Sequence, residues 1–310
     1  MGAPAIRDLD DALGRADAAA ARLRELSEPS AGEGGSPRAR ELHVVTCLYD
    51  TAHHDLEALT RGRLSEAEEV AAALPGWSVS FTIVDDAPAA DGRCVANVVA
   101  ELLAARTAPV VRLGSLTLPE RGPADQKGRA LRHGLADRLE RGGASDLFAY
   151  VNFNRKVHLR QLISVLEPIL RSGHAASFAT RAPEEGGAVH GAGAAGRLKS
   201  RVYNALVRLR LPPLRGWRDT NAPMKVFTAP ALRHLLAVAR VDDVSFDSEW
   251  LLALCAGGFS VGRAPVIWRQ ESGSRPPWGA VPRVLRSLGA QRRRWLRGAY
   301  EASAASREAG

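Results

Sequence analysis

The residues best suited to chemistry lie in the last third of the chain, where charged side chains alternate with short apolar runs. Asp219 stands in a polar loop, Lys225 begins a short strand pattern, and Asp247 opens a helical pattern that leads to an apolar edge strand. A carboxylate in such a place can take a proton from a reacting hydroxyl, and an ammonium group can bind a phosphate. This order of loop, strand, helix and edge strand indicates a site that holds a reacting substrate.

Further polar groups stand at the ends of apolar runs upstream. Asp85 and Asp86 end the strand pattern of residues 78–84, and Lys127 precedes a helical pattern that carries Arg132 about one turn in. In open α/β sheets ligands bind at the carboxyl ends of strands, and a helix N-terminus favours phosphate. Two alternatives remain open at this point, since the aspartates can be turn caps and the basic residues can be solvated surface cations.

The downstream motifs resemble the family 2 glycosyltransferases, in the branch of polyprenyl-phosphate (dolichyl-phosphate-type) mannosyl- and glucosyltransferases. The family's run reads approximately Asp-Thr-x-x-Gly-x-Lys-x-Phe, Phe-Asp-x-Glu-x-Leu and Pro-Val-x-Trp. The matching segments here are Asp219-Thr220, Lys225-Val226-Phe227, Phe246-Asp247-Ser248-Glu249 and Pro265-Val266-Ile267-Trp268.

The resemblance continues upstream at lower density and covers roughly residues 41–275. Asp85-Asp86 is similar to the family's Val-Val-Asp-Asp-Gly-Ser, and residues 127–134 are similar to Gly-Lys-Gly-x-Ala-x-Arg-x-Gly. Thr180-Arg181 stands where the family has Ser-Arg, ahead of a helix at 200–207 that is similar to the family's Ser-x-x-Tyr-Asn-x-Leu-Val.

The resemblance implies a GT-A-type, Rossmann-like α/β fold with a mostly parallel sheet flanked by helices. It also implies an inverting transferase that moves a hexose from a UDP- or GDP-linked sugar to a polyprenyl phosphate or a related acceptor. The residues that it assigns to binding of the donor or of phosphate are Asp85, Asp86, Lys127, Arg132, Asn152, Asn154, Arg181 and Lys225. The catalytic candidates are Asp247, Asp219 and Lys156.

One motif departs from the family. Where the family has its metal-binding Asp-x-Asp after an apolar strand, this chain has Asn152-Phe153-Asn154 after residues 148–151. Amide oxygens can ligate Mg²⁺ or Mn²⁺, but without carboxylate charge the affinity falls sharply. Either the site works without a metal, with Arg155 or Lys156 supplying positive charge to the phosphates, or the protein binds its ligand without turnover.

The nature of the acceptor decides whether a base is needed. A lipid phosphate is already anionic, so it needs little base catalysis, whereas a hydroxyl acceptor must lose a proton. For a soluble hydroxyl acceptor, Asp247 is the candidate base. A non-catalytic glycosyltransferase-like protein that binds nucleotide sugars is the alternative from another class.

The basic residues are concentrated in one segment near the end of the sequence. The 310 residues are 45% hydrophobic and 25% charged, which is typical of a globular chain with a buried core. The formal net charge is +8, and residues 276–300 contain six arginines and no acid. This segment also contains Val284, Leu285, Leu288, Trp295 and Leu296. A basic amphipathic tail of this kind predicts contact with an anionic membrane, with packing on the body as the alternative. Nucleic acid is not expected as a partner, because no recognised motif or aromatic platform accompanies the charge.

Three cysteines at positions 47, 94 and 255 show no paired spacing, which favours free thiols in a reducing compartment. The adjacent histidines 53 and 54 are not expected to form a zinc site. The first residues carry Asp8, Asp10 and Asp11 where a signal peptide needs apolar residues, and no long apolar run follows. These features predict a cytoplasmic protein, peripheral to the inner face of the membrane if the tail binds there.

Four regions are expected along the chain. Residues 1–27 contain an amphipathic helix, 28–40 form a linker, 41–275 form the glycosyltransferase-like domain, and 276–310 form the basic tail. The glycine- and alanine-rich stretch 186–196 is predicted to be a mobile loop that closes over a ligand, with an unstructured surface insertion as the alternative.

Overall fold

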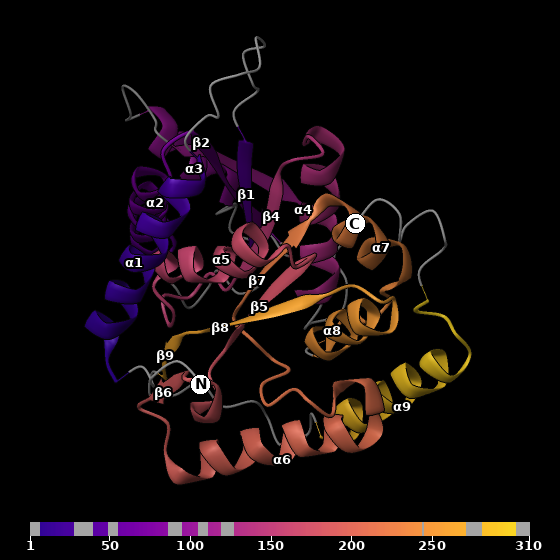
Figure 1. Cartoon of the computed structure of the whole chain (residues 1–310). Coiled ribbons are helices and arrows are strands. Elements are labelled where there is room, and N and C mark those ends of the chain that lie inside the picture. The colour runs from indigo at the N-terminus through magenta and orange to yellow at the C-terminus, as the bar shows by residue number, and fades with distance from the viewer. Residues whose placement is uncertain are drawn as a thin grey trace.

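The computed structural model (Figure 1) describes residues 7–27, 40–48, 55–85, 95–104, 111–118, 127–243, 245–270 and 281–301. Several residues discussed above lie outside these ranges, namely His53, His54, Asp86, Cys94 and most of the expected linker 28–40. None of the helices in the described part of the chain is long and apolar enough to cross a membrane.

A seven-stranded sheet forms the centre of the molecule. Its strands lie in the order β3-β2-β1-β4-β7-β5-β8, and every neighbouring pair is parallel except those made by β7, which runs antiparallel to β4 and β5. The strands are β1 (Arg40–Leu48), β2 (Trp77–Asp85), β3 (Val111–Thr117), β4 (Leu147–Val151), β5 (Ala176–Thr180), β7 (Met224–Thr228) and β8 (Val261–Pro265).

Helices cover both faces of this sheet (Figure 1). On one face lie α1 (Leu9–Ser27), α2 (Leu56–Ala73), α3 (Val95–Ala104) and α5 (Leu162–Ser172), the last preceded by the short helix η1 (Leu159–Gln161). On the other face lie α4 (Lys127–Arg141), α7 (Ala229–Val238) and α8 (Phe246–Ala256). The mostly parallel, doubly covered sheet agrees with the predicted fold class.

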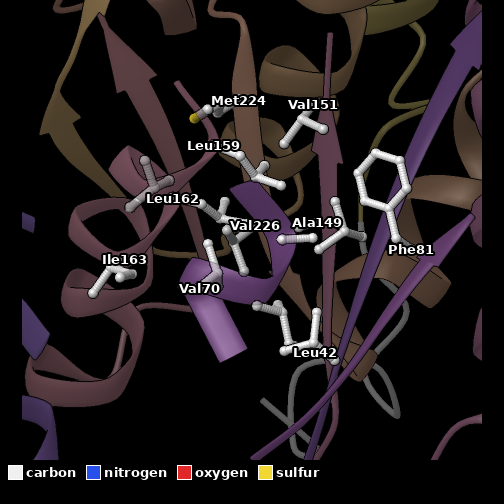
Figure 2. Packing of buried hydrophobic residues seen from close by; sticks show 14 of the residues in the cluster. Leu42, Val70, Phe81, Ala149, Val151, Leu159, Leu162, Ile163, Met224 and Val226 are labelled. Atoms are coloured by element: carbon white, nitrogen blue, oxygen red, sulfur yellow. The ribbon is translucent and has the colours of Figure 1, made fainter. Parts of the chain in front are cut away.

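The central strands are apolar on both sides because both faces are covered. In β4, Ala149 and Val151 point into the core beneath α2 and α5, while Phe148 and Tyr150 point into the core beneath α4, α7 and α8. Figure 2 shows the first of these cores, in which Leu42, Phe81 and Val226 from three strands meet Val70 of α2 and residues of α5. This packing fixes the strand ends, from which the candidate site is built.

Two glycines bring α4 directly onto the strands and the neighbouring loop. A Cβ on Gly134 would lie 2.5 Å from Val84 of β2 and 2.7 Å from Val45 of β1. A Cβ on Gly128 would lie 2.6 Å from the Val241 carbonyl. Larger side chains at these positions would push the helix outward, so the glycines of the motif at 127–134 place the first residue of α4 at the strand ends.

The N-terminal helix packs on the body of its own chain. Its buried alanines and Leu23 lie against the first core, and Arg22 makes a bidentate ion pair with Glu167 of α5 at 2.6 and 2.9 Å. The helix expected within the first 27 residues is therefore a covering element of the α5 face.

Two parts of the chain differ from expectation. Residues 188–190, within the predicted mobile loop, form strand β6 (Ala188–His190), which pairs with β9 (Ile267–Arg269). A Cβ on Gly187 would lie 2.3 Å from the Thr180 carbonyl, so these glycines allow close backbone contact rather than motion. The prediction of a mobile loop is wrong for this strand.

The basic tail is a helix, α9 (Val281–Leu296), and its apolar side faces the body. Leu288 is fully buried, and Val284 and Trp295 are partly buried against the second core. Arg294 and Tyr300 both contact the buried Glu249 of α8, at 2.7 and 2.8 Å. The packing alternative is therefore observed for Leu288, Val284 and Trp295, whereas Leu296 of the predicted membrane-binding set is 64% exposed.

Candidate donor and phosphate site

The polar residues singled out in the sequence gather at one edge of the sheet. Asp85 ends β2, Asn152 follows β4, and Arg181 follows β5. Because β7 is antiparallel to β4, with Met224 opposite Val151, the loop that enters β7 lies at the same edge. The topology therefore brings segments far apart in sequence to the carboxyl ends of the parallel strands, where ligands bind in open α/β sheets.

Lys127 lies at the centre of this edge. Its Nζ donates a hydrogen bond to Oδ1 of Asn152, which also accepts one from the hydroxyl of Tyr150 at 2.5 Å. The ammonium lies 5.2 Å from the centre of the Tyr150 ring and 5.9 Å from that of Phe246. Among the described residues, no carboxylate lies within ion-pair distance of Lys127, so its positive charge is not neutralised within the site.

The loop after β4 is held by a buried arginine of α2. The side chain of Arg63 is fully buried, and burial lowers the pKa of its guanidinium from its usual value. Its acceptors are the carbonyls of Asn152 (2.8 Å), Phe153 (3.0 Å), Val157 (2.9 Å) and Asn154, and Oε2 of Glu66 (2.6 Å). One side chain thus fixes the backbone that presents both asparagines.

A second lysine without a carboxylate partner lies beside Trp268. Lys156 is 8% exposed, and its Nζ lies 5.9 Å from the centre of the Trp268 indole. The guanidinium of Arg181 lies 5.3 Å from the same ring. No carboxylate among the described residues pairs with Lys156, although a buried cation is costly unless an anion is nearby. This corner of the site therefore suits an anionic ligand.

Arg181 itself is held by a carboxylate from the next segment. Asp219 accepts from its Nε and Nη2, each at 2.8 Å, and from its backbone N–H at 2.9 Å. Burial alone would raise the pKa of Asp219, but the Arg181 charge and these donors bring it below its usual value. Thr220 is fixed in turn by Asn204 of helix α6 (Ala194–Arg210), whose Oδ1 accepts from its N–H at 3.0 Å.

Beneath the site lies a second cation and carboxylate pair. The fully buried Nζ of Lys225 donates to Oδ1 of Asp247 at 2.5 Å and to the Ala222 carbonyl at 2.6 Å. Burial lowers the pKa of Lys225, and the charge of Asp247 restores it only in part. The ammonium also lies 4.7 Å from the centre of the Tyr150 ring, so the pair packs directly below the Lys127 contact.

Two basic candidates from the sequence make other contacts. Arg132 pairs with Asp242 and donates to the Val241 carbonyl at 2.8 Å, so it holds the loop between α7 and α8. Arg155, one of the residues considered as a source of charge for the phosphates, donates to Glu66 at 2.7 Å beside α2. Within the described part of this edge, the candidate cations that have no carboxylate partner are instead Lys127 and Lys156.

Among the described residues at this edge, no group of three carboxylate or histidine ligands lies close enough together to hold a divalent cation. Mg²⁺ and Mn²⁺ prefer several oxygen ligands that include carboxylates. Here Oδ1 of Asn152 already accepts two hydrogen bonds, and Asp219 and Asp247 are each paired with a cation. Oδ1 of Asn154 is buried and has no hydrogen-bond partner, but it is a single neutral ligand.

Within the described residues, one group has the side chains and spacing of a metal site, namely Glu41, His43 and Asp146. It lies at the opposite end of the strands, next to a cavity of about 280 Å³. His43 there contacts Ser80 at 2.9 Å and Asp146 at 3.3 Å, and Glu41 pairs with Arg112. These groups satisfy one another, so the cluster is a buried polar network of the fold.

Sequence reasoning assigned no role to Arg63, Tyr150 or Asn204. Arg63 did carry a signal, because it stands within the apolar stripe of α2 formed by Leu56, Thr60, Leu64, Ala67 and Val70, where an arginine needs buried partners. Asn204 was also marked, as the asparagine of the motif at 200–207, whereas Tyr150 gave no comparable signal.

The mostly parallel, doubly covered sheet has a GT-A type of architecture. No protein-family model matches the sequence, and no curated protein matches it. Solved structures do match, and among them are crystal structures of glucosyl-3-phosphoglycerate synthase from Mycobacterium tuberculosis.

The UDP complex of that enzyme is 13% identical, with a TM-score of 0.55 over 98% of this chain and 88% of the synthase chain. Its complex with Mn²⁺, UDP-glucose and phosphoglyceric acid is 14% identical, with a TM-score of 0.55 over 94% and 85% of the two chains. A complex with Mg²⁺ and UDP is 15% identical, with a TM-score of 0.51 over 96% and 84%. At these identities the similarity establishes the fold, and it gives no support to the polyprenyl-phosphate branch over others.

Proposed function

We propose that the protein is a hexosyltransferase that uses a nucleoside diphosphate sugar and works without a divalent cation. The observation that carries this proposal is the pair of lysines, Lys127 and Lys156, that lie at the end of β4 without carboxylate partners among the described residues. The similarity in fold to a synthase crystallised with UDP and UDP-glucose supports the same class of donor.

The chemistry requires cations at the leaving group. As the acceptor oxygen bonds to the anomeric carbon, the bond from that carbon to the diphosphate oxygen breaks, and its electron pair remains on the diphosphate. Fixed positive charges aimed at that oxygen lower the barrier. Lys127 suits this role because its ammonium is positioned by Asn152, and a lysine delivers a point charge to phosphate as a metal ion does.

The acceptor side favours a phosphorylated molecule. Arg181 lowers the pKa of Asp219, which makes this carboxylate a weak base. Oδ1 of Asp247 already accepts a hydrogen bond from the ammonium of Lys225. An acceptor phosphate is already ionised and needs no base, and Lys156, Arg181 and Trp268 offer it cations beside an aromatic ring. A polyprenyl phosphate, as the sequence resemblance implies, and a soluble phosphorylated acid, as in the synthase complexes, both have this chemistry.

The proposal is tested by incubating the purified protein with UDP- and GDP-hexoses and with either a polyprenyl phosphate in detergent or phosphoglyceric acid, in the presence of a chelator. We expect transfer to a phosphate-bearing acceptor, detected by mass spectrometry, with the anomeric inversion that the resemblance implies checked by NMR. Lys156→Met should lower kcat/KM for the acceptor by about ten- to a hundredfold, because it removes a charged contact to the acceptor phosphate and a hydrogen bond to a charged group contributes about 1.5–3 kcal/mol.

Two outcomes separate the alternatives. Nucleotide binding without transfer to any acceptor would favour the non-catalytic binding protein. The observation that supports this alternative is that Asn152 and Asn154 replace both aspartates expected from the resemblance. A requirement for Mn²⁺ in the transfer reaction would contradict the metal-independent mechanism.

A further inference from the structure

Helix α6 has two unlike sides. Its inner side carries the buried Asn204 and Val207, which face the body, and Asn204 holds the loop that enters β7. Its outer side carries Leu198, Val202 and Leu209, which are 62, 49 and 69% exposed. Their spacings of four and seven residues place them on one stripe, together with the exposed Ala205.

Basic residues flank this apolar stripe on both sides. In a helix with 3.6 residues per turn, Arg197, Arg201 and Arg208 lie along one border and Lys199 and Arg210 lie along the other. The helix contains no acidic residue. It therefore has the pattern of an interfacial helix, with a narrow apolar stripe between two basic borders.

Helix α9 extends this surface. It contacts α6 (Figure 1). Like α6, it contains basic residues, five in number, and no acid. Leu296 near its end is 64% exposed. Among the large apolar side chains of the described residues that are exposed, four of five lie on these two helices, and the fifth is Leu103 of α3. We call the outer sides of α6 and α9 the α6–α9 face.

We infer that the α6–α9 face binds the surface of an anionic lipid bilayer. Scattered exposed leucines are ordinary, but an aligned stripe bordered by cations is not explained by solubility. A second copy of the chain does not suit this face, because a twofold contact would bring like charges together. A nucleic acid would use the cations and leave the apolar stripe unburied, whereas anionic lipid headgroups and acyl chains use both.

The residues that would contact the membrane are not those expected from the sequence of the tail alone. The apolar side of α9 is buried in the body, so α6 supplies the apolar contact and α9 supplies charge. The inner side of α6 positions the loop at Thr220, so binding through the outer side would bring the acceptor edge near the bilayer. The inference stands apart from the proposed function, because vesicle binding is measured without nucleotide or acceptor.

The test is flotation of the full-length protein with vesicles of phosphatidylcholine alone or mixed with phosphatidylglycerol, at low and high salt. We expect binding to the anionic vesicles that exceeds binding to phosphatidylcholine by about tenfold and that high salt reverses. The combined variant Leu198→Gln, Val202→Gln and Leu209→Gln should reduce this binding by about tenfold, since the stripe supplies the buried apolar area. Leu103→Gln is the matched control and should bind as the wild type does.

A second variant, Arg201→Gln with Arg293→Gln, tests the charge at exposed positions and should weaken binding at low salt. Wild-type protein that stays in solution with anionic vesicles at low salt would overturn the inference. So would full binding by the variant that lacks the apolar stripe. A dimer in light scattering that the same variant dissociates would assign the face to a second copy of the chain and would also overturn it.

Discussion

Lys127→Met is expected to reduce the affinity for UDP or GDP by about ten- to a hundredfold, because a hydrogen bond to a charged group contributes about 1.5–3 kcal/mol. Methionine keeps the apolar stem that packs near Tyr150 and Phe246, and it removes the ammonium that lies on Asn152. The melting temperature should change little, since the side chain contributes no ion pair to the described structure. Titration calorimetry and thermal denaturation measure the two effects.

Arg129→Met is the matched control for this variant. It removes the same charge from the same helix, but Arg129 lines a separate cavity together with Arg132 and His133. The control should bind nucleotide with nearly the wild-type affinity. Equal losses in the two variants would show that general electrostatic attraction, rather than the Lys127 position, carries binding.

Arg63→Met is expected to lower the free energy of unfolding by about 3–5 kcal/mol, as is usual when one partner of a buried, hydrogen-bonded charge pair is removed. The change leaves four carbonyls of the loop after β4 without their donor, and it leaves the buried Glu66 without its main counter-charge. Because burial alone would raise the pKa of Glu66 and Arg63 lowers it, loss of Arg63 should also raise that pKa. Urea denaturation measures the change in stability.

Arg61→Met provides the control on the same helix. Arg61 forms an exposed pair with Glu57 one turn away, and such surface pairs contribute little. The Arg63 variant should also bind nucleotide more weakly than this control under conditions where both are folded, because the backbone of Asn152 and Asn154 is no longer fixed. An Arg63 variant with wild-type stability and affinity would refute the positioning role.

Much of the fold could be predicted because its signals are local. The apolar runs ending at Leu48, Asp85 and Val151 became β1, β2 and β4, and the glycine-punctuated motif after Lys127 became α4. The fold class was implied by the family resemblance that these segments carry. Strand β6 was missed because three residues among glycines and alanines carry no periodicity, and its partner β9 lies far away in the sequence.

The site could be located but not assembled from the sequence. The strand-end residues were identifiable, yet the contact of Lys127 with Asn152 depends on how α4 packs, which Gly128 and Gly134 decide in three dimensions. The same limit explains the tail, where the apolar residues of α9 predicted a membrane face. The body provides a partner for Leu288 that no local pattern reveals. In the described structure, the exposed apolar stripe lies on α6 instead of α9.

In the proposed mechanism, lysine charge at the end of β4 takes the place of a divalent cation at the diphosphate. Titration calorimetry of UDP and GDP in a chelator and in Mn²⁺ tests it most directly. We expect the dissociation constants of UDP and GDP to agree within about threefold between the two conditions. The reason is that the amide oxygens of Asn152 and Asn154 bind Mn²⁺ only weakly. A gain of about tenfold or more from Mn²⁺ in the wild-type protein would contradict it.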